Sequence, residues 1–259
     1  MAALEQHLNA EVSVLRDSVQ PILAYAQREL KDFTIHGELH SENVEKILTD
    51  IISRCNTQVG PCNINPYEKY ILICCAWLHD IGVVLGREEH NSKTCSIIDK
   101  LYPAFLEGLD SKFVEFVKIV CLYHSKKMQI QQVPVQSPFS GTFIRLQYLT
   151  AILRIADAAD MDNKRAPIGV FEIIKEKLTK KSQKIWRSHQ AVRDVSFLPE
   201  GNSIIITVKD KRTSLHAVND FKLEFSLVSA ILEKYDFPFT QIAVVRENRA
   251  IYRGQHRLS

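Results

Sequence analysis

The sequence predicts a mainly α-helical fold that ends in a small β-containing piece. Apolar residues recur at helical spacing up to about residue 189, as in the stretch VEKILTDIIS. Beyond that point the pattern changes to short strand-like runs, as in AVRDVSFLPEGNSIIITVKD, where turn residues separate two apolar segments. The chain shows no internal repeat. We therefore expect a helical domain at residues 1–189 and a β-β-α-β subdomain with a loose tail at residues 190–259.

Length and composition limit the class of protein. The chain has 259 residues, enough for one large domain or for a medium domain with a small appendage. Its formal net charge of +3 does not indicate a nucleic-acid partner, and it leaves a phosphorylated ligand open. The longest apolar run, residues 71–78, is far shorter than the roughly 20 residues of a membrane span, and no secretory signal is visible. We expect a cytoplasmic protein with no membrane partner.

The cysteines predict a reduced protein without a zinc knuckle. They contain no Cys-x-x-Cys pair, and four of them lie in segments that we expect to be helical. A free cysteine in such a segment usually behaves as a small buried apolar residue. We therefore expect buried thiols at all six positions: Cys55, Cys62, Cys74, Cys75, Cys95 and Cys121.

The first helices follow from their periodicity and from their expected ends. Residues 4–30 have a helical pattern, which we expect Pro21 to interrupt. The clearest amphipathic helix follows, and we expect Ser41 to cap its first turn. Its apolar stripe consists of Val44, Ile47, Leu48, Ile51 and Ile52. Residues 67–79 should form a helix that is buried nearly all round, because almost every side chain in that stretch is apolar.

Later elements alternate between helices and connections. A helix is expected after His90, and another at residues 111–124. Residues 126–141 form a long polar connection, and helices follow at residues 147–159 and 168–186. In the tail, two strands flank a turn at residues 199–202, Asn219 caps a helix, and TQIAVVREN forms a third strand.

Polar groups that can bind metals stand at the ends of several of these apolar helices. Taken alone, each histidine is more often a structural residue than a ligand. Asp157 differs, because it continues the apolar stripe of its helix and so should point inward. A buried carboxylate needs a cation, and either Arg154 or a metal ion would supply one. The full set of such groups is His40, His79, Asp80, His90, His124 and Asp157.

Four of these groups make a plausible ligand set for a metal. His40, His79, Asp80 and Asp157 combine nitrogen and oxygen donors without a thiolate, which suits manganese, iron, cobalt or nickel, and magnesium less well. His79 and Asp80 are neighbours, so on a regular helix they would diverge by about 100°. We expect Gly82 to let the backbone leave the helix just beyond them.

The ordered set resembles the HD-domain metal-dependent phosphohydrolases. The resemblance covers roughly residues 32–162 and rests on FTIHGELHSENV, on LHDIG and on LRIADAADMD. It implies an HD-domain helical bundle with one or two divalent ions per chain, held by the four residues above. His90 and His124 match positions that either bind a second metal or contact substrate phosphate. The chain departs from the family pattern at Val83, where a lysine often stands, and it lacks the Gly-Tyr-Pro signature of one branch.

The resemblance also implies an activity, which is the hydrolysis of a nucleotide or another small phosphoester by a metal-activated water. Asp80 would orient or deprotonate the water, and His90 or His124 would protonate the leaving oxygen. Arg154 and Asp160 would orient Asp157 without binding the metal themselves. His36 would at most support these groups, and Lys93, Lys126 and Lys127 are more simply read as surface lysines than as phosphate ligands.

Two other functions stay open from the sequence. The chain could be a non-catalytic module that senses a nucleotide and signals through its tail or through a partner protein. It could also be a purely structural helical domain, although inward carboxylates at Asp80 and Asp157 argue against that reading. A homodimer is compatible with either function.

Overall fold

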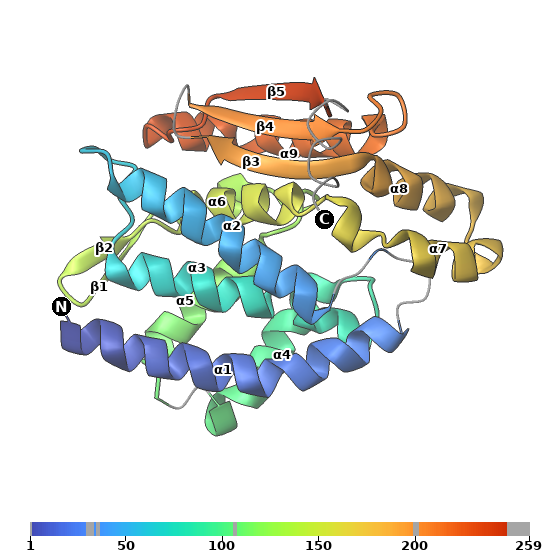
Figure 1. The fold of residues 1–259 in the computed structure, drawn as a ribbon. Helices are drawn as coiled ribbons and strands as arrows, with labels where there is room; N and C mark the ends of the chain where they lie inside the picture. Colours follow the sequence, from blue (N-terminus) through green and yellow to red (C-terminus); the bar gives the residue numbers. More distant parts are fainter. Residues whose placement is uncertain (1, 30–33, 35–36, 106–107, 199–201, 248–259) are drawn as a thin grey trace, which may run out of the picture.

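The computed structural model describes residues 2–29, 34, 37–105, 108–198 and 202–247. The fold is mainly α-helical, as predicted. Figure 1 shows α1 at one side of the molecule and the larger sheet at the opposite side, with most of the other helices between them. The helices are α1 (Ala2–Glu29), α2 (Glu38–Asn56), α3 (Pro66–Leu78), α4 (His90–Phe105), α5 (Ser111–Leu122), α6 (Leu146–Ala159), α7 (Ile168–Ile174), α8 (Lys180–Ala191) and α9 (Leu215–Lys234).

Helix α3 lies at the centre and touches α1, α2, α5 and α6. Its start is fixed by a capping box, in which Asn65 and Glu68 each bond to the other's backbone N–H, and Pro66 occupies its first turn. Every residue from Tyr70 to Leu78 is buried. The all-round burial confirms the prediction for this segment, and it explains why nearly all these side chains are apolar.

Two predictions about the first helices are wrong. Helix α1 continues through Pro21, because Val19 and Leu23 on either side are both buried in the core and their packing outweighs the local cost of the proline. Helix α2 begins at Glu38, one turn before the predicted cap, and Gly37 precedes it. Ser41 is therefore inside the helix and buried. The earlier start places His40 on the same buried face as Val44.

The segment between α5 and α6 is more ordered than the sequence suggested. A hairpin of β1 (Ser137–Phe139) and β2 (Thr142–Ile144), which pair antiparallel, begins within the predicted polar connection and continues past its end at residue 141. Gly141 at the hairpin turn has a φ of 77°, a conformation that glycine adopts without strain. Short 3-10 helices lie at η1 (Ile81–Leu85), η2 (Ile130–Gln132), η3 (Asn163–Arg165) and η4 (Lys175–Lys177).

The single helix predicted at residues 168–186 is two helices. α7 ends at Ile174, and α8 begins at Lys180 with Thr179 as its N-cap. The Thr179 hydroxyl accepts a hydrogen bond from the backbone N–H of Ser182, which satisfies a free donor of the new helix start.

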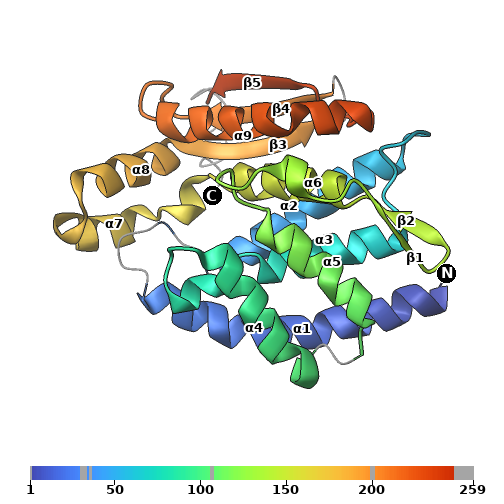
Figure 2. The ribbon, with the colours of Figure 1, turned by 180° about the vertical axis from the view of Figure 1, so that it is seen from behind.

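The C-terminal order β3 (Val192–Leu198), β4 (Ser203–Val208), α9 and β5 (Gln241–Arg246) confirms the predicted β-β-α-β arrangement. β3 and β4 pair antiparallel, and β4 and β5 pair parallel. Figures 1 and 2 show α9 lying along one face of this sheet. The turn predicted at residues 199–202 falls largely outside the described residues, as do His36 and the predicted loose tail from residue 248.

Asn219 does not cap α9. The helix begins at Leu215, and Asn219 lies inside it. One of its first backbone donors, the N–H of Ala217, bonds instead to the buried hydroxyl of Ser188 on α8 at 2.8 Å. A cap supplied by a distant helix leaves no local pattern in the sequence.

One hydrophobic core joins the helices and the sheet. It includes Val44 and Leu149 from the helical part together with Ile204 and Phe221 from the C-terminal part. The division of the chain at residue 189 therefore stays a prediction. All six cysteines are free, and all but Cys95 are fully buried.

No single helix among the described residues is long and apolar enough to cross a membrane. One bent pair, residues 66–85 with residues 90–103, reaches that length and composition only when its two parts are taken together.

Candidate metal centre

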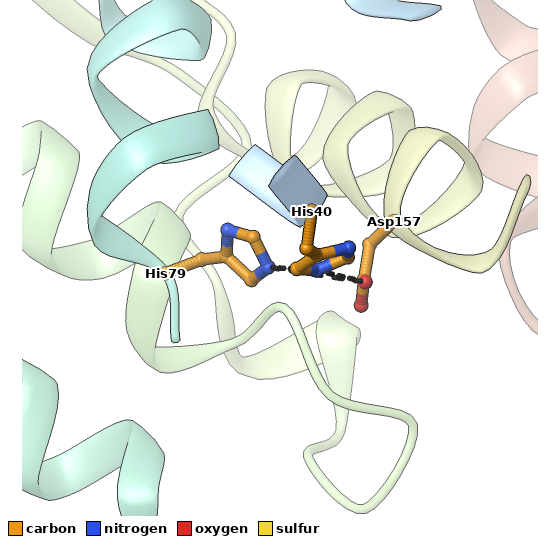
Figure 3. Close-up of side chains that lie close together, drawn as sticks. All are labelled: His40, His79 and Asp157. Atoms are coloured by element: carbon orange, nitrogen blue, oxygen red, sulfur yellow. Dashed lines mark hydrogen bonds and ion pairs between the residues drawn. The ribbon is translucent and has the colours of Figure 1, made fainter. Parts of the chain in front are cut away.

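The structure brings His40, His79 and Asp157 together from α2, the end of α3 and α6 (Figure 3). His40 lies between the other two. Its Nε2 is 3.1 Å from Nε2 of His79 and 3.2 Å from Oδ1 of Asp157. The three potential ligand atoms lie within 4.8 Å of one another. We call these residues the first group.

In each histidine of the first group, Nδ1 makes a hydrogen-bond contact outside the group. Nδ1 of His79 is 3.0 Å from the carbonyl oxygen of Cys75 and 3.1 Å from that of Ala76. Nδ1 of His40 is 2.6 Å from Oδ2 of Asp160. A carbonyl oxygen can only accept, so Nδ1 of His79 carries the hydrogen and Nε2 is left with a lone pair. Contacts of this kind fix the orientation of metal-binding imidazoles.

Asp80, His90 and His124 form a second group beside the first. Nε2 of His90 and Nε2 of His124 are each 3.4 Å from Oδ1 of Asp80. Their Nδ1 atoms are also directed to backbone carbonyls, Arg87 for His90 and Cys121 for His124. In both groups, therefore, the histidines present Nε2 toward the carboxylates.

Asp80 connects the two groups. Its Oδ1 faces His90 and His124, whereas its Oδ2 is 3.7 Å from Nε2 of both His40 and His79. The side chain is only 13% exposed. One carboxylate thus offers one oxygen to each group.

Helix α4 packs closely against the turn that follows α3. His79 is the C-cap of α3, and Asp80 is the N-cap of the 3-10 helix η1. A Cβ on Gly82 would lie 2.0 Å from the carbonyl oxygen of His90 and 2.5 Å from the backbone nitrogen of Thr94. The Thr94 hydroxyl also accepts from the N–H of Gly82 and donates to the carbonyl of His79. We expected Gly82 to supply backbone freedom, but it is needed because α4 approaches so closely.

The electrostatics of the first group favour a positive charge. Burial and the charge of Arg165 lower the pKa of His40, but its hydrogen bonds with Asp157 and Asp160 outweigh them and raise the pKa to about 9. Burial lowers the pKa of His79 to about 4, so this ring is neutral at pH 7. Burial alone would raise the pKa of Asp157, yet its hydrogen bond with His40 and the two imidazoles hold that pKa well below its usual range.

The second group has the same pattern. Burial lowers the pKa of His124, but the hydrogen bond with Asp80 and its negative charge outweigh that effect and raise the pKa to about 9. Burial lowers the pKa of His90. Each group thus combines one neutral imidazole with one that is protonated at pH 7 and sits against carboxylates. In the first group, that proton separates two Nε2 atoms only 3.1 Å apart.

The donor set of both groups fits a divalent cation. Imidazole nitrogens and carboxylate oxygens suit first-row transition metals, and the anchored Nδ1 atoms leave Nε2 free to bind. A cation could replace the proton on His40, because it would satisfy both Nε2 atoms and the carboxylate of Asp157 together. Either cluster could therefore hold a metal ion.

Arg154 is not the counter-charge of Asp157, which was one of the two alternatives that the sequence offered. Its guanidinium forms a buried ion pair with Glu224 of α9. Asp160 contacts His40 and not Asp157, and it also accepts a hydrogen bond from Asn43. Asp157 itself is partly open, with 29% of its side chain exposed. The predicted counter-charge for Asp157 is therefore supplied by histidines.

A cavity of about 300 Å³ lies against these groups, and Asp80, His90, His124 and Asp157 line it. Cations that the sequence did not single out also line it, namely Arg87 and Arg165. Lys126 reaches the cavity and pairs with Asp220. Lys93 bonds to the backbone of Leu85 and Gly86. No local pattern marks Arg87 or Arg165, because each reaches the cavity from a loop or a short 3-10 helix.

A comparison with protein families gives a match to the family model described as HD-CE over residues 30–235, which is most of the chain. No curated protein matches the sequence.

Proposed function

The chain belongs to the HD-CE family, and from this premise we propose that it is a metal-dependent phosphohydrolase acting on a nucleotide or another small phosphoester. The observation that supports this proposal most strongly is Asp80, whose two oxygens face two separate His/Asp groups beside one cavity. A structural role alone would not need two clusters of imidazoles and carboxylates open to a cavity.

We assign His40, His79, Asp80 and Asp157 to a first divalent ion. His90 and His124, together with Asp80, would hold a second ion or contact the substrate directly. When bound, a divalent ion supplies Lewis acidity, which polarises a phosphoryl oxygen and makes a nearby water a stronger acid.

Side chains at the cavity would move the protons and offset the charge of the substrate. Asp80 orients the attacking water and accepts its proton, because it lies at the cavity wall between the two groups. Where His124 contacts the substrate and not a second ion, its hydrogen bond with Asp80, which raises its pKa to about 9, would keep it protonated at pH 7, and it would give that proton to the leaving oxygen. Arg87, Arg165 and Lys126 line the same cavity and would offset the negative charge of a phosphate.

The test is metal analysis of the purified chain together with hydrolysis of a panel of nucleotides and a generic aryl phosphate. We expect bound divalent metal and turnover of at least one substrate. Asp80→Ala should abolish turnover and reduce the metal content. Asp99→Asn is the matched control, since Asp99 is an exposed carboxylate on α4 paired with Lys118.

Two results would redirect the proposal. Bound metal without turnover of any substrate would favour the alternative function, a nucleotide-sensing module that works with a partner. Chelation that changes neither thermal stability nor metal content would contradict the metal centre itself.

A further inference from the structure

Helices α7 and α8 form a helical hairpin that projects from one edge of the molecule. Figure 1 shows both helices at the right-hand edge, beyond the ends of α1 and of the sheet, and Figure 2 shows the same projection from behind. The hairpin has its own small apolar cluster, in which Phe171 of α7 stacks on Trp186 of α8 with ring centroids 6.0 Å apart. The side chain of Gln183 also donates to the carbonyl oxygens of Lys175 and Leu178. These contacts fix α7 against α8.

Apolar side chains are exposed along α7. Ile168, Val170 and Ile173 are 63%, 43% and 81% exposed, although the helix has only seven residues. The helix packs through Phe171, with Ile174 partly buried beside it. A single exposed apolar side chain is ordinary on a protein surface, but three within two helical turns form a patch, and such patches mark interaction surfaces.

The same hairpin concentrates positive charge. Residues 168–191 include six lysines and arginines and two glutamates, a net charge of +4. Of the 33 basic and 30 acidic residues in the chain, 27 and 28 lie elsewhere, so the rest of the chain is nearly neutral. Lys175 pairs with Glu172 at 2.6 Å. The other five basic residues of the hairpin are all exposed: Lys177, Lys180, Lys181, Lys184 and Arg187.

The charged face of α8 adjoins α7. Lys180, Lys184 and Arg187 are separated by four and three residues, so they share one face of the helix. The guanidinium carbon of Arg187 lies 5.6 Å from the centroid of the Phe171 ring, which brings this face against the helix that carries the apolar patch. We call the three exposed apolar residues of α7 and the five exposed basic residues of the hairpin the α7–α8 surface.

A membrane that contains anionic phospholipids matches both properties of this surface. Its negative surface potential attracts lysines and arginines, and its interfacial layer takes up apolar side chains. A nucleic acid would favour exposed aromatic rings for stacking, but Phe171 and Trp186 of the hairpin are buried. The expectation of no membrane partner rested on the lack of a spanning segment, which binding at the membrane surface does not require.

We propose that the α7–α8 surface docks the chain on a membrane that contains anionic phospholipids. The apolar residues of α7 enter the interfacial layer, and the lysines lie at the level of the lipid phosphates. Ser182 and Ile185 of α8 line the cavity beside the metal centre, so docking would bring this cavity close to the membrane. The inference does not depend on the proposed hydrolysis, because no residue of the surface belongs to the two His/Asp groups.

The test is flotation of the full chain with lipid vesicles. One set of vesicles contains phosphatidylcholine alone, and the other contains about 30% phosphatidylserine, both at an ionic strength of about 0.15 M. We expect at least about tenfold tighter binding to the phosphatidylserine vesicles, and loss of this difference at about 1 M salt, because salt screens the attraction. Equal binding to the two sets at the lower salt concentration, or no binding to either, would overturn the proposal.

Two double variants of equal net charge test where the charge must lie. Lys180→Glu/Lys181→Glu changes the α7–α8 surface, whereas Lys46→Glu/Lys100→Glu changes exposed lysines of α2 and α4. A basic residue near an anionic membrane contributes about a fivefold gain in affinity, so the first variant should bind phosphatidylserine vesicles at least about 25-fold more weakly. The second variant should stay within about threefold of wild type. Equal losses in the two variants would contradict this location.

A third variant tests the apolar part of the surface. Ile168→Ser/Ile173→Ser should unfold in urea like wild type, because both side chains are exposed, yet it should bind phosphatidylserine vesicles about tenfold more weakly. Val59→Ser/Val135→Ser, at exposed valines in two other connections, is the matched control and should bind like wild type. Wild-type binding by the folded Ile168→Ser/Ile173→Ser chain would reject the membrane and leave a polyanion, such as a nucleic acid, as the partner of the basic residues.

Discussion

Asp160→Asn should weaken metal binding without removing any ligand. Oδ2 of Asp160 lies 2.6 Å from Nδ1 of His40, and the residue is only 3% exposed. The substitution keeps the shape of the side chain but removes its negative charge. A hydrogen bond to a charged group contributes about 1.5–3 kcal/mol, and groups that orient a metal-binding histidine typically change metal affinity by about 10–100-fold.

The effect of this substitution should depend on pH, because Asp160 acts on His40 in two opposing ways. It orients the ring for a metal, but it also helps to raise the pKa of His40 to about 9, so that a proton competes with the metal at neutral pH. Near pH 9.5 the proton has largely left, and only the orienting effect remains. We therefore expect the full loss of affinity near pH 9.5 and a smaller loss at pH 7.

The assay is a titration with Ni²⁺ buffered by nitrilotriacetate at both pH values, using wild type, Asp160→Asn and the exposed control Asp99→Asn. A folded Asp160→Asn chain that binds Ni²⁺ within twofold of wild type at pH 9.5 would refute the role of Asp160. An equal loss of affinity at both pH values would contradict the competing effect, in which Asp160 helps to hold a proton on His40.

Three further predictions test the packing and the charges around the site. Gly82→Ala should lower the free energy of urea unfolding by about 2 kcal/mol or more, because the new Cβ would lie 2.0 Å from a backbone oxygen of α4. Gly169→Ala is the control: a Cβ there would have nothing within 4 Å, so the free energy of unfolding should fall by less than about 0.5 kcal/mol. Arg154→Met should destabilise the chain by about 3–5 kcal/mol, since it leaves Glu224 buried and unpaired, and adding Glu224→Leu should recover much of that loss; equal stability of the single and double variants would contradict this. Because the pKa of His40 is raised, its contribution to the stability of the metal-free chain is complete below pH 6.5 and is lost as the pH rises through about 9. Urea unfolding measured across this pH range should therefore show a declining free energy of unfolding.

The candidate ligands could be identified from the sequence because each is a polar residue in an apolar setting. His79 and Asp80 end a buried helix, and Asp157 continues an apolar stripe. Their order and spacing, including His40, matched a family pattern, so the sequence was enough to suggest that they meet. The helical body and the β-β-α-β tail followed from periodicity in the same way.

What the sequence did not predict depends on partners that are distant along the chain. Arg154 pairs with Glu224 of α9, seventy residues later, and not with its helical neighbour Asp157. Asp160 contacts His40 across 120 residues. The first turn of α9 is capped by Ser188 of another helix. Local patterns carry no information about such contacts, because tertiary packing decides them.

Anomalous diffraction from crystals grown with Mn²⁺ would test the metal centre most directly. The account predicts an anomalous peak bounded by Nε2 of His40, Nε2 of His79 and the carboxylate of Asp157, next to Oδ2 of Asp80. Ordered side chains in this arrangement with no peak between them, at a Mn²⁺ concentration that saturates binding in solution, would contradict it.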